Sequence, residues 1–265
     1  GGTLGDDGTP RYYSIQAGEK TYADYEIVIT NPGGHSSRPT GTNAIVDMAG
    51  VLERIGAYEF PVQTSDVTLG YFRETAKQTP GDLGEAMARF ADDPSDPAAD
   101  ARLSKEPEYV GQIRTTCVAT MINGGHAQNA LPQHVSANVN CRIFPGVSPE
   151  DILQKLQDIA GKGATVSLPI AGHSSDSSPL DAVVMAAVRK AVDGQAPGLP
   201  IIPQMSAGAT DSLFFRAEGI PSYGVSGIFM KPSDDYAHGL NERVPVDSIP
   251  GALEHWHTLL TELAG

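Results

Sequence analysis

The sequence contains few cysteines, few positive charges and no long apolar run. Two cysteines in 265 residues, with no C-x-x-C pair, exclude a disulfide scaffold and a zinc site built from thiolates. Lys and Arg total 18 against 32 Asp and Glu, so the net charge is −14. A nucleic-acid partner is not expected, because phosphate contacts need clustered cations. No apolar run approaches the roughly 20 residues of a membrane-spanning helix, so no membrane partner is expected either.

Several catalytic motifs are also missing. The sequence has no H-E-x-x-H, no G-x-S-x-G, no G-x-G-x-x-G and no P-loop, which weighs against classical zincins, serine hydrolases and nucleotide-binding proteins. The 40% hydrophobic and 19% charged content is ordinary for a globular chain of one large or two modest domains. The chain starts at Gly1 without a Met, so we expect it to be processed or part of a longer protein. The compartment therefore stays open, with the cytoplasm slightly favoured.

Strand and helix patterns alternate in the first two thirds of the chain. Helical spacing begins at Thr42 and again at Ser148-Pro149, where a serine cap precedes a proline in the first turn. Period-two alternation predicts strands in four segments: 22–30, 113–122, 135–144 and 164–168. The resulting order of strand, helix, strand, strand, helix, strand is that of a ferredoxin-like α+β sandwich.

A long segment interrupts this order. Residues 57–109 are long for a connection and include an Asp/Pro-rich stretch at 91–100. We interpret them as a partly mobile insertion with short helices near 68–77 and 83–90.

The C-terminal third is expected to form a second α/β unit. Ser178-Pro179 is predicted to cap one of its helices. The terminal helix is predicted to bury an apolar face: Leu253, Trp256, Leu259, Leu260 and Leu263. His255 and His257 lie two apart on that helix and are predicted to be surface residues.

Five further residues are the strongest candidates for chemistry or covalent bonding. His35 lies in a Gly-rich loop between a strand and a helix, and His238 in a loop with an amide and a carboxylate nearby. Arg142 ends a strand, where it could grip a carboxylate with both guanidinium branches; a surface salt bridge is the alternative. Cys141 occupies an alternating strand position, as does Cys117, which favours two small buried hydrophobes over a cross-strand disulfide.

Taken together, these motifs resemble the zinc-dependent aminoacylases and carboxypeptidases of peptidase family M20, which also include succinyl-diaminopimelate desuccinylases. The matching motifs occur in the family's order over nearly the whole chain: Gly33-Gly-His-Ser-Ser37, Arg114-Thr-Thr, Asn129-Ala-Leu-Pro132, Asn138-Val-Asn-Cys-Arg-Ile-Phe-Pro145, Gly208-Ala-Thr-Asp211 and His238-Gly-Leu-Asn-Glu242. The strand around Arg114 and the long insertion look most like the carboxypeptidase S and N-acyl-amino-acid hydrolase branch.

The resemblance implies an α/β protein in which a ferredoxin-like lid is inserted into a zinc-peptidase catalytic domain. Residues 21–169 would be the lid, with 57–109 as its insertion. Residues 1–20 would be a remnant of the catalytic domain, and 170–265 its C-terminal part. Such lids usually dimerise, so the resemblance also implies a homodimer through the lid.

The resemblance also assigns roles to residues. His238 matches a zinc ligand, and His35 matches the lid histidine that stabilises the oxyanion, typically in the partner's active site. Asn129 and Arg142 match residues that hold the substrate's carboxylate or carbonyl. The loop with Gly208 and Thr210 matches a loop that contacts substrate.

The implied reaction is hydrolysis of an amide next to a free carboxylate, in an N-acyl amino acid or at the C-terminal residue of a peptide. In the family, two zinc ions activate the attacking water, and a Glu takes its proton. The other zinc ligands and that Glu would precede Gly1, so this chain supplies at most one of five ligands and is expected to be inactive alone. The alternative is a non-catalytic dimerisation or binding fragment, or a degenerate member of the family.

Overall fold

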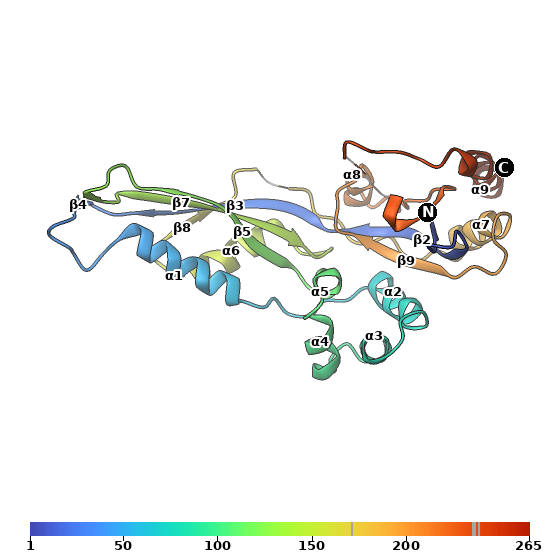
Figure 1. Cartoon of the computed structure of the whole chain (residues 1–265), viewed down its shortest axis with the longest axis horizontal. Coiled ribbons are helices and arrows are strands. Elements are labelled where there is room, and N and C mark those ends of the chain that lie inside the picture. The colour runs from blue at the N-terminus through green and yellow to red at the C-terminus, as the bar shows by residue number, and fades with distance from the viewer. Residues whose placement is uncertain (171, 235–236, 238) are drawn as a thin grey trace.

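The computed structural model describes the whole chain except four residues: Ala171, Asp235, Tyr236 and His238. His238, the predicted zinc ligand, therefore lies outside the described residues. The molecule is elongated, with one sheet toward each end and a group of helices near the junction between them (Figure 1).

The first sheet is the predicted ferredoxin-like one. Its antiparallel strands lie in the order β5-β7-β3-β8, and two helices pack against one face. The elements are β3 (Thr21–Thr30), α1 (Ala44–Ala57), β5 (Thr116–Gly124), β7 (His134–Ile143), α6 (Pro149–Ala160) and β8 (Thr165–Ser167). If the four strands are numbered 1 to 4 along the chain, the order β8-β3-β7-β5 is 4-1-3-2. This is the order of the ferredoxin-like fold that the sequence predicted.

The two central strands alternate strictly between a buried and a polar face. The buried side chains belong to one cluster that includes Tyr25, Ile27 and Ile29 of β3, with Val139 and Ile143 of β7. Residues on a strand point alternately to opposite sides, so every second side chain enters the core. This confirms the predicted alternation of both strands.

The prediction for residues 113–122 was wrong in its boundaries and its burial. Ile113 ends a helix, and β5 begins only at Thr116. As the edge strand, β5 pairs on one side alone, and three of its apolar side chains are more than half exposed: Val118 at 58%, Met121 at 62% and Ile122 at 55%. The unpaired edge therefore presents apolar side chains and free backbone groups together.

The two cysteines form a disulfide, so the prediction of two buried thiols was wrong. Cys117 and Cys141 are direct partners in the register of β5 and β7, which places them within bonding reach. Disulfides persist in oxidising compartments, so the bridge weighs against the cytoplasm as the place where this chain folds.

The disulfide leads to a first prediction. The unfolded, unreduced chain should show no thiol to Ellman's reagent, and two after reduction. Replacing Cys117 and Cys141 by serine should lower the free energy of unfolding by about 3 kcal/mol, because the bridge restrains the unfolded chain. Denaturation in urea measures the change. Two reactive thiols before reduction would show that the bridge does not form.

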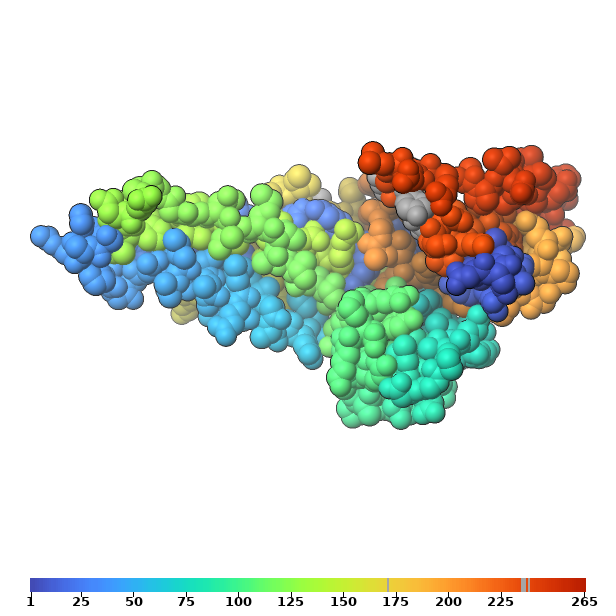
Figure 2. All heavy atoms as spheres, viewed as in Figure 1, coloured from blue at the N-terminus to red at the C-terminus, as the bar shows by residue number. Residues whose placement is uncertain are grey.

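The long insertion is a packed helical unit. It contains four helices: α2 (Asp66–Ala76), α3 (Asp82–Asp92), α4 (Pro97–Leu103) and α5 (Pro107–Ile113). They share a core that includes Phe72, Phe90 and Leu103. The Asp/Pro-rich stretch starts α4, because the Asp96 side chain accepts bonds from the first amides of the helix. Figure 2 shows the insertion as a lobe beside the junction of the two sheets.

The second sheet combines both ends of the chain, in the order β10-β1-β2-β9. Its strands are β1 (Gly2–Leu4), β2 (Pro10–Glu19), β9 (Ile201–Ser206) and β10 (Phe229–Met230). The helices of this part are α7 (Ala182–Asp193), α8 (Ser212–Ala217) and α9 (Ile249–Ala264), with single 3-10 turns η1 (Pro232–Asp234) and η2 (Val246–Ser248). A two-residue ladder, β4 (Gly34–His35) with β6 (Ala130–Leu131), lies at the far end of the first sheet (Figure 1).

Two helix predictions in this part need correction. Asp181, not Ser178, caps α7, because its carboxylate accepts from the amides of Val183 and Val184. Helix α9 packs with Ala252, His255 and Leu259, and His255 is only 1% exposed beside Tyr13. Most of the predicted buried face is instead exposed: Leu253, Trp256, Leu260 and Leu263. Within the described part of the chain, no helix has the length and apolar character needed to cross a membrane.

Candidate functional site

Arg142 and the loop that follows β9 meet at the junction of the two sheets. Arg142 lies on the polar face of β7, and its Nη1 donates a hydrogen bond to the carbonyl of Ala207 at 2.9 Å. Its guanidinium lies over the ring of Tyr22, 4.7 Å from the centroid. No ion pair among the described residues includes Arg142. One predicted substrate residue is thus next to the predicted substrate loop.

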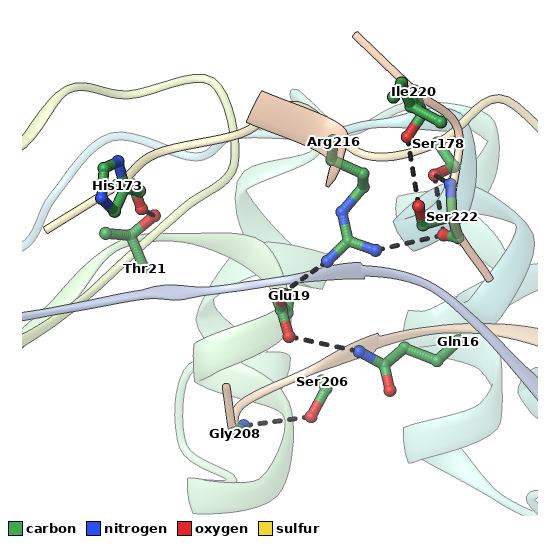
Figure 3. Close-up of polar contacts among 10 residues, drawn as sticks. All are labelled: Gln16, Glu19, Thr21, His173, Ser178, Ser206, Gly208, Arg216, Ile220 and Ser222. Atoms are coloured by element: carbon green, nitrogen blue, oxygen red, sulfur yellow. Dashed lines mark hydrogen bonds and ion pairs between the residues drawn. The ribbon is translucent and has the colours of Figure 1, made fainter. Parts of the chain in front are cut away.

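The loop of residues 207–211 presents polar groups to solvent. Gly208 and Thr210 are both exposed. The Gly208 amide donates to Ser206 Oγ at 3.0 Å, which shapes the start of the loop (Figure 3). The loop then leads directly into α8, so a strand and a helix position its two ends.

The other predicted residues, His35 and Asn129, lie together at the far end of the first sheet, which we call the tip. His35 pairs with Ala130 in the β4–β6 ladder, and the Asn129 carbonyl accepts from the Ser36 amide at 3.0 Å. Gly33 has a φ of +76°, and a Cβ there would come within 2.5 Å of the Gln133 side chain, so this turn needs glycine.

The His35 ring is exposed, and the local backbone fixes its tautomer. The Ser37 amide donates to Nδ1 at 3.2 Å, so the neutral ring carries its proton on Nε2. That N–H has no partner among the described hydrogen bonds and is available as a donor.

One chain does not bring the tip and the junction together. They lie at opposite ends of the ten-residue strands β3 and β7 (Figure 1). At about 3.4 Å per residue, these strands separate them by about 30 Å. His35 and Arg142 of the same chain therefore cannot act on one small substrate in this conformation.

Sequence reasoning missed three buried charges at the junction. Glu19 and Arg216 form an ion pair of 2.7 Å with side chains 0% and 2% exposed, and Gln16 donates to the other Glu19 oxygen. Lys20 is also 2% exposed and donates to the carbonyl of Arg114 at 2.9 Å. The one local signal was the pair of adjacent charges, Glu19 and Lys20, immediately before β3, and this signal does not point to Arg216.

Lys20 should make stability depend on pH. Burial, and then the nearby charge of Arg142, lower its pKa to about 7. In the unfolded chain, lysine has a pKa near 10.4. Between about pH 7 and this value, Lys20 therefore keeps its proton in the unfolded chain and loses it in the folded chain. Stability should therefore rise from about pH 7 toward pH 10, by at most about 1.4 kcal/mol per pH unit.

Urea denaturation at pH 7, 8 and 9 measures this rise. The Lys20→Met variant should gain less stability over that range than the parent chain. The exposed Lys190→Met variant should behave as the parent does. Equal gains in the parent chain and Lys20→Met would contradict the assignment.

The described residues do not assemble a metal site. No group of three or more His, Cys, Asp or Glu among them is placed to hold a metal ion. His238 lies outside these residues, so its predicted role as a ligand remains a prediction.

The chain is similar to several characterised proteins. Human N-fatty-acyl-amino acid synthase/hydrolase PM20D1 is 26% identical over 94% of this chain, and mouse aminoacylase-1 is 30% identical over 62% of it. The fold matches the M20 family metallo-carboxypeptidase Sso-CP2 from Sulfolobus solfataricus with a TM-score of 0.64 and 18% identity, covering 98% of this chain and 61% of that one. The dipeptidase Dug1p from Saccharomyces cerevisiae gives 0.57 at 15% identity, covering 98% and 57%.

These matches reach only part of each relative. The chain spans 51% of human PM20D1 and 40% of mouse aminoacylase-1. Residues 17–165 match the sequence profile of the M20 peptidase dimerisation domain, which is more than half of the chain. The chain therefore belongs to the M20 peptidase family.

Proposed function

We propose that the complete protein hydrolyses amide bonds next to a free carboxylate, in N-acyl amino acids or at the C-terminal residue of peptides. The observation that carries this proposal is the contact between Arg142 and Ala207, because it joins a fork-shaped cation to a loop with exposed polar groups. The relatives support it: their names include an N-fatty-acyl-amino acid synthase/hydrolase, an aminoacylase and a carboxypeptidase S-like protein.

Arg142 and the 207–211 loop would hold the substrate. The guanidinium lies over the Tyr22 ring and its Nη1 bonds to Ala207, which leaves its other nitrogens to bind a carboxylate in bidentate fashion. Lysine would offer a point charge without that fork. The Thr210 hydroxyl and Gly208 are exposed beside this position and could orient the substrate's amide.

His35 would act in the site of a second chain. Its Nε2–H suits the stabilisation of a developing oxyanion, with Asn129 beside it to hold the carbonyl. Because the tip lies about 30 Å from Arg142 of its own chain, we propose a homodimer in which each tip serves the partner's junction. The unpaired edge of β5, with Val118 and Met121 exposed, offers a surface for lid pairing.

The domain assignment follows from the same proposal. Residues 21–169 would be the lid, and 1–20 with 170–265 would belong to the catalytic domain. The exposed stripe beginning at η2 and running along α9 would be covered by the rest of that domain: Val246, Ile249, Leu253, Trp256, Leu260 and Leu263. An uncovered apolar stripe at helical spacing is unusual on a complete domain.

Zinc dependence is proposed for the complete protein only. His238 would supply one ligand, and the remaining ligands would come from outside this chain, whose described residues form no metal site. We therefore expect this chain alone to be inactive.

A hydrolysis assay of the complete protein tests the proposal. N-acyl amino acids should be cleaved, and their methyl esters, which lack the carboxylate, should be cleaved poorly. A zinc chelator or His238→Ala should abolish cleavage, whereas His257→Ala, an exposed histidine of α9, should not. Full activity with chelator, or after His238→Ala, would overturn the zinc-dependent mechanism. No cleavage of any amide would favour a non-catalytic family member.

A further inference from the structure

The 207–211 loop begins at a point fixed by residues 19 and 20. Ser206 ends β9 and pairs with Glu19 in the parallel register of β2 and β9. The Lys20 amide donates to the Ser206 carbonyl at 2.9 Å. Backbone bonds from the end of β2 thus hold the chain where it enters the loop.

The loop ends in α8, and α8 is bound to the same residue. The amides of Leu213 and Phe214 each donate at 3.2 Å to the carbonyls of Thr210 and Asp211, so the end of the loop and the start of the helix form one unit. Arg216, in the last turn of α8, reaches back so that its Nη2 lies 2.7 Å from Glu19 Oε1 (Figure 3). The end of β2 therefore holds both ends of the loop, one through the backbone amide of Lys20 and one through the carboxylate of Glu19.

Further hydrogen bonds fix Arg216 against β2. Its Nη1 donates to the Ser222 carbonyl at 3.1 Å, and the Ser222 amide donates to Ser178 Oγ at 2.9 Å. The Ser178 amide then donates to the carbonyl of Ala17 at 2.7 Å, two residues before Glu19. Arg216 is thus tied to β2 both through its own ion pair and through this second route. Figure 3 shows the ion pair and the bonds among Arg216, Ser222 and Ser178.

The same short segment also sets the position of Arg142. Only Lys20 separates the end of β2 from the start of β3, so one extended chain passes from the second sheet to the first. Two residues later, Tyr22 pairs with Arg142 and lies beneath its guanidinium. Residues 19–22 therefore position both the 207–211 loop and Arg142, which contacts it.

We propose that Glu19 and Arg216 are positioning residues, which hold the 207–211 loop at the distance from Arg142 that carboxylate binding requires. This inference rests on the proposed function for its catalytic consequence, but the placement of the loop can be tested without activity. The competing explanation is that the buried pair only stabilises the fold.

Hydrogen exchange on this chain tests the placement. In Glu19→Gln, the amides of Leu213 and Phe214 should exchange about tenfold faster, while amides of β3 and β7 keep their protection. Leu156→Ala, which removes a buried side chain from the core of the first sheet, should accelerate exchange in β3 and β7 and leave the amides of Leu213 and Phe214 unchanged. If Glu19→Gln does not fold, Arg216→Lys keeps the charge and should give a smaller acceleration in the same amides. Unchanged exchange of the Leu213 and Phe214 amides in either folded variant would overturn the inference.

Kinetics of the complete protein test the consequence. Glu19→Gln should raise KM for N-acyl amino acids about tenfold with a smaller change in kcat, because the substrate is held less well before reaction. KM for the methyl esters should stay nearly the same, since they lack the carboxylate. A purely structural pair would instead lower kcat for both substrates in proportion to the unfolded fraction. An inactive parent protein would overturn the proposed function but leave the exchange result standing.

Discussion

Replacing His35 by alanine is expected to lower kcat of the complete protein by about 100- to 1000-fold, the usual effect of removing one oxyanion donor. The side chain is exposed at the tip, and the hydrogen bonds of its Nδ1 are local to Ser37, so stability should change little. KM should also change little, because the donor acts on charge that develops only in the transition state. Steady-state kinetics and urea denaturation measure the two effects separately. A normal kcat would remove His35 from the site.

The proposed homodimer adds an expectation about the chain in which His35 acts. If each tip serves the partner's junction, every site combines Arg142 of one chain with His35 of the other. In a mixed dimer of the two variants, one of the two sites then has both residues intact. Random exchange between equal amounts should therefore restore about a quarter of the parent activity. Each variant refolded alone is the control. Mixed dimers without restored activity would show that the site is not shared between chains.

The central part of the first sheet could be predicted because its signals are local. Every second residue is apolar from Ala23 in β3 and from Val135 in β7, and burial on one face requires that period. Ser148 and Pro149 mark the start of α6, where Ser148 Oγ accepts from the Asp151 amide. These patterns depend on a few neighbouring residues, so no knowledge of distant contacts was needed.

The errors lie where burial depends on a neighbour that the pattern does not name. Several apolar residues of β5 and α9, among them Met121 and Leu253, have the right spacing for a core, but nothing in the described structure covers them, so they are exposed. His255 is buried because Tyr13, from the other end of the chain, stacks on it. Cys117 and Cys141 form a bridge because the register of two strands makes them partners.

The candidate site shows the same division. Arg142 and the Gly208 loop were found from short motifs, but their contact depends on how the two sheets join. The ion pair between Glu19 and Arg216 joins residues almost 200 positions apart and has no local signal. Residue type also argues against predicting that Glu19 and Arg216 are buried, since charged side chains are rarely buried without a partner. Only the fold reveals that each supplies the partner of the other.

Removing one member of that pair is the second large effect. Arg216→Met should lower the free energy of unfolding by about 3–5 kcal/mol, because the Glu19 carboxylate, 0% exposed, then has no countercharge. This is a large share of the roughly 5–15 kcal/mol that holds a typical domain together. Urea denaturation at neutral pH, followed by circular dichroism, measures the loss.

A double variant separates the charge from the packing. With both Glu19→Met and Arg216→Met, no buried charge is left unpaired, and most of the lost stability should return, as it does when buried pairs are replaced by apolar side chains of similar size. Lys190→Met, which breaks an exposed pair with Glu262, should cost less than about 1 kcal/mol. If the double variant were as unstable as Arg216→Met, the loss would come from missing side-chain contacts instead. If the double variant regains stability but the amides of Leu213 and Phe214 still exchange faster than in the parent chain, the charged pair positions the loop as well as stabilising the fold.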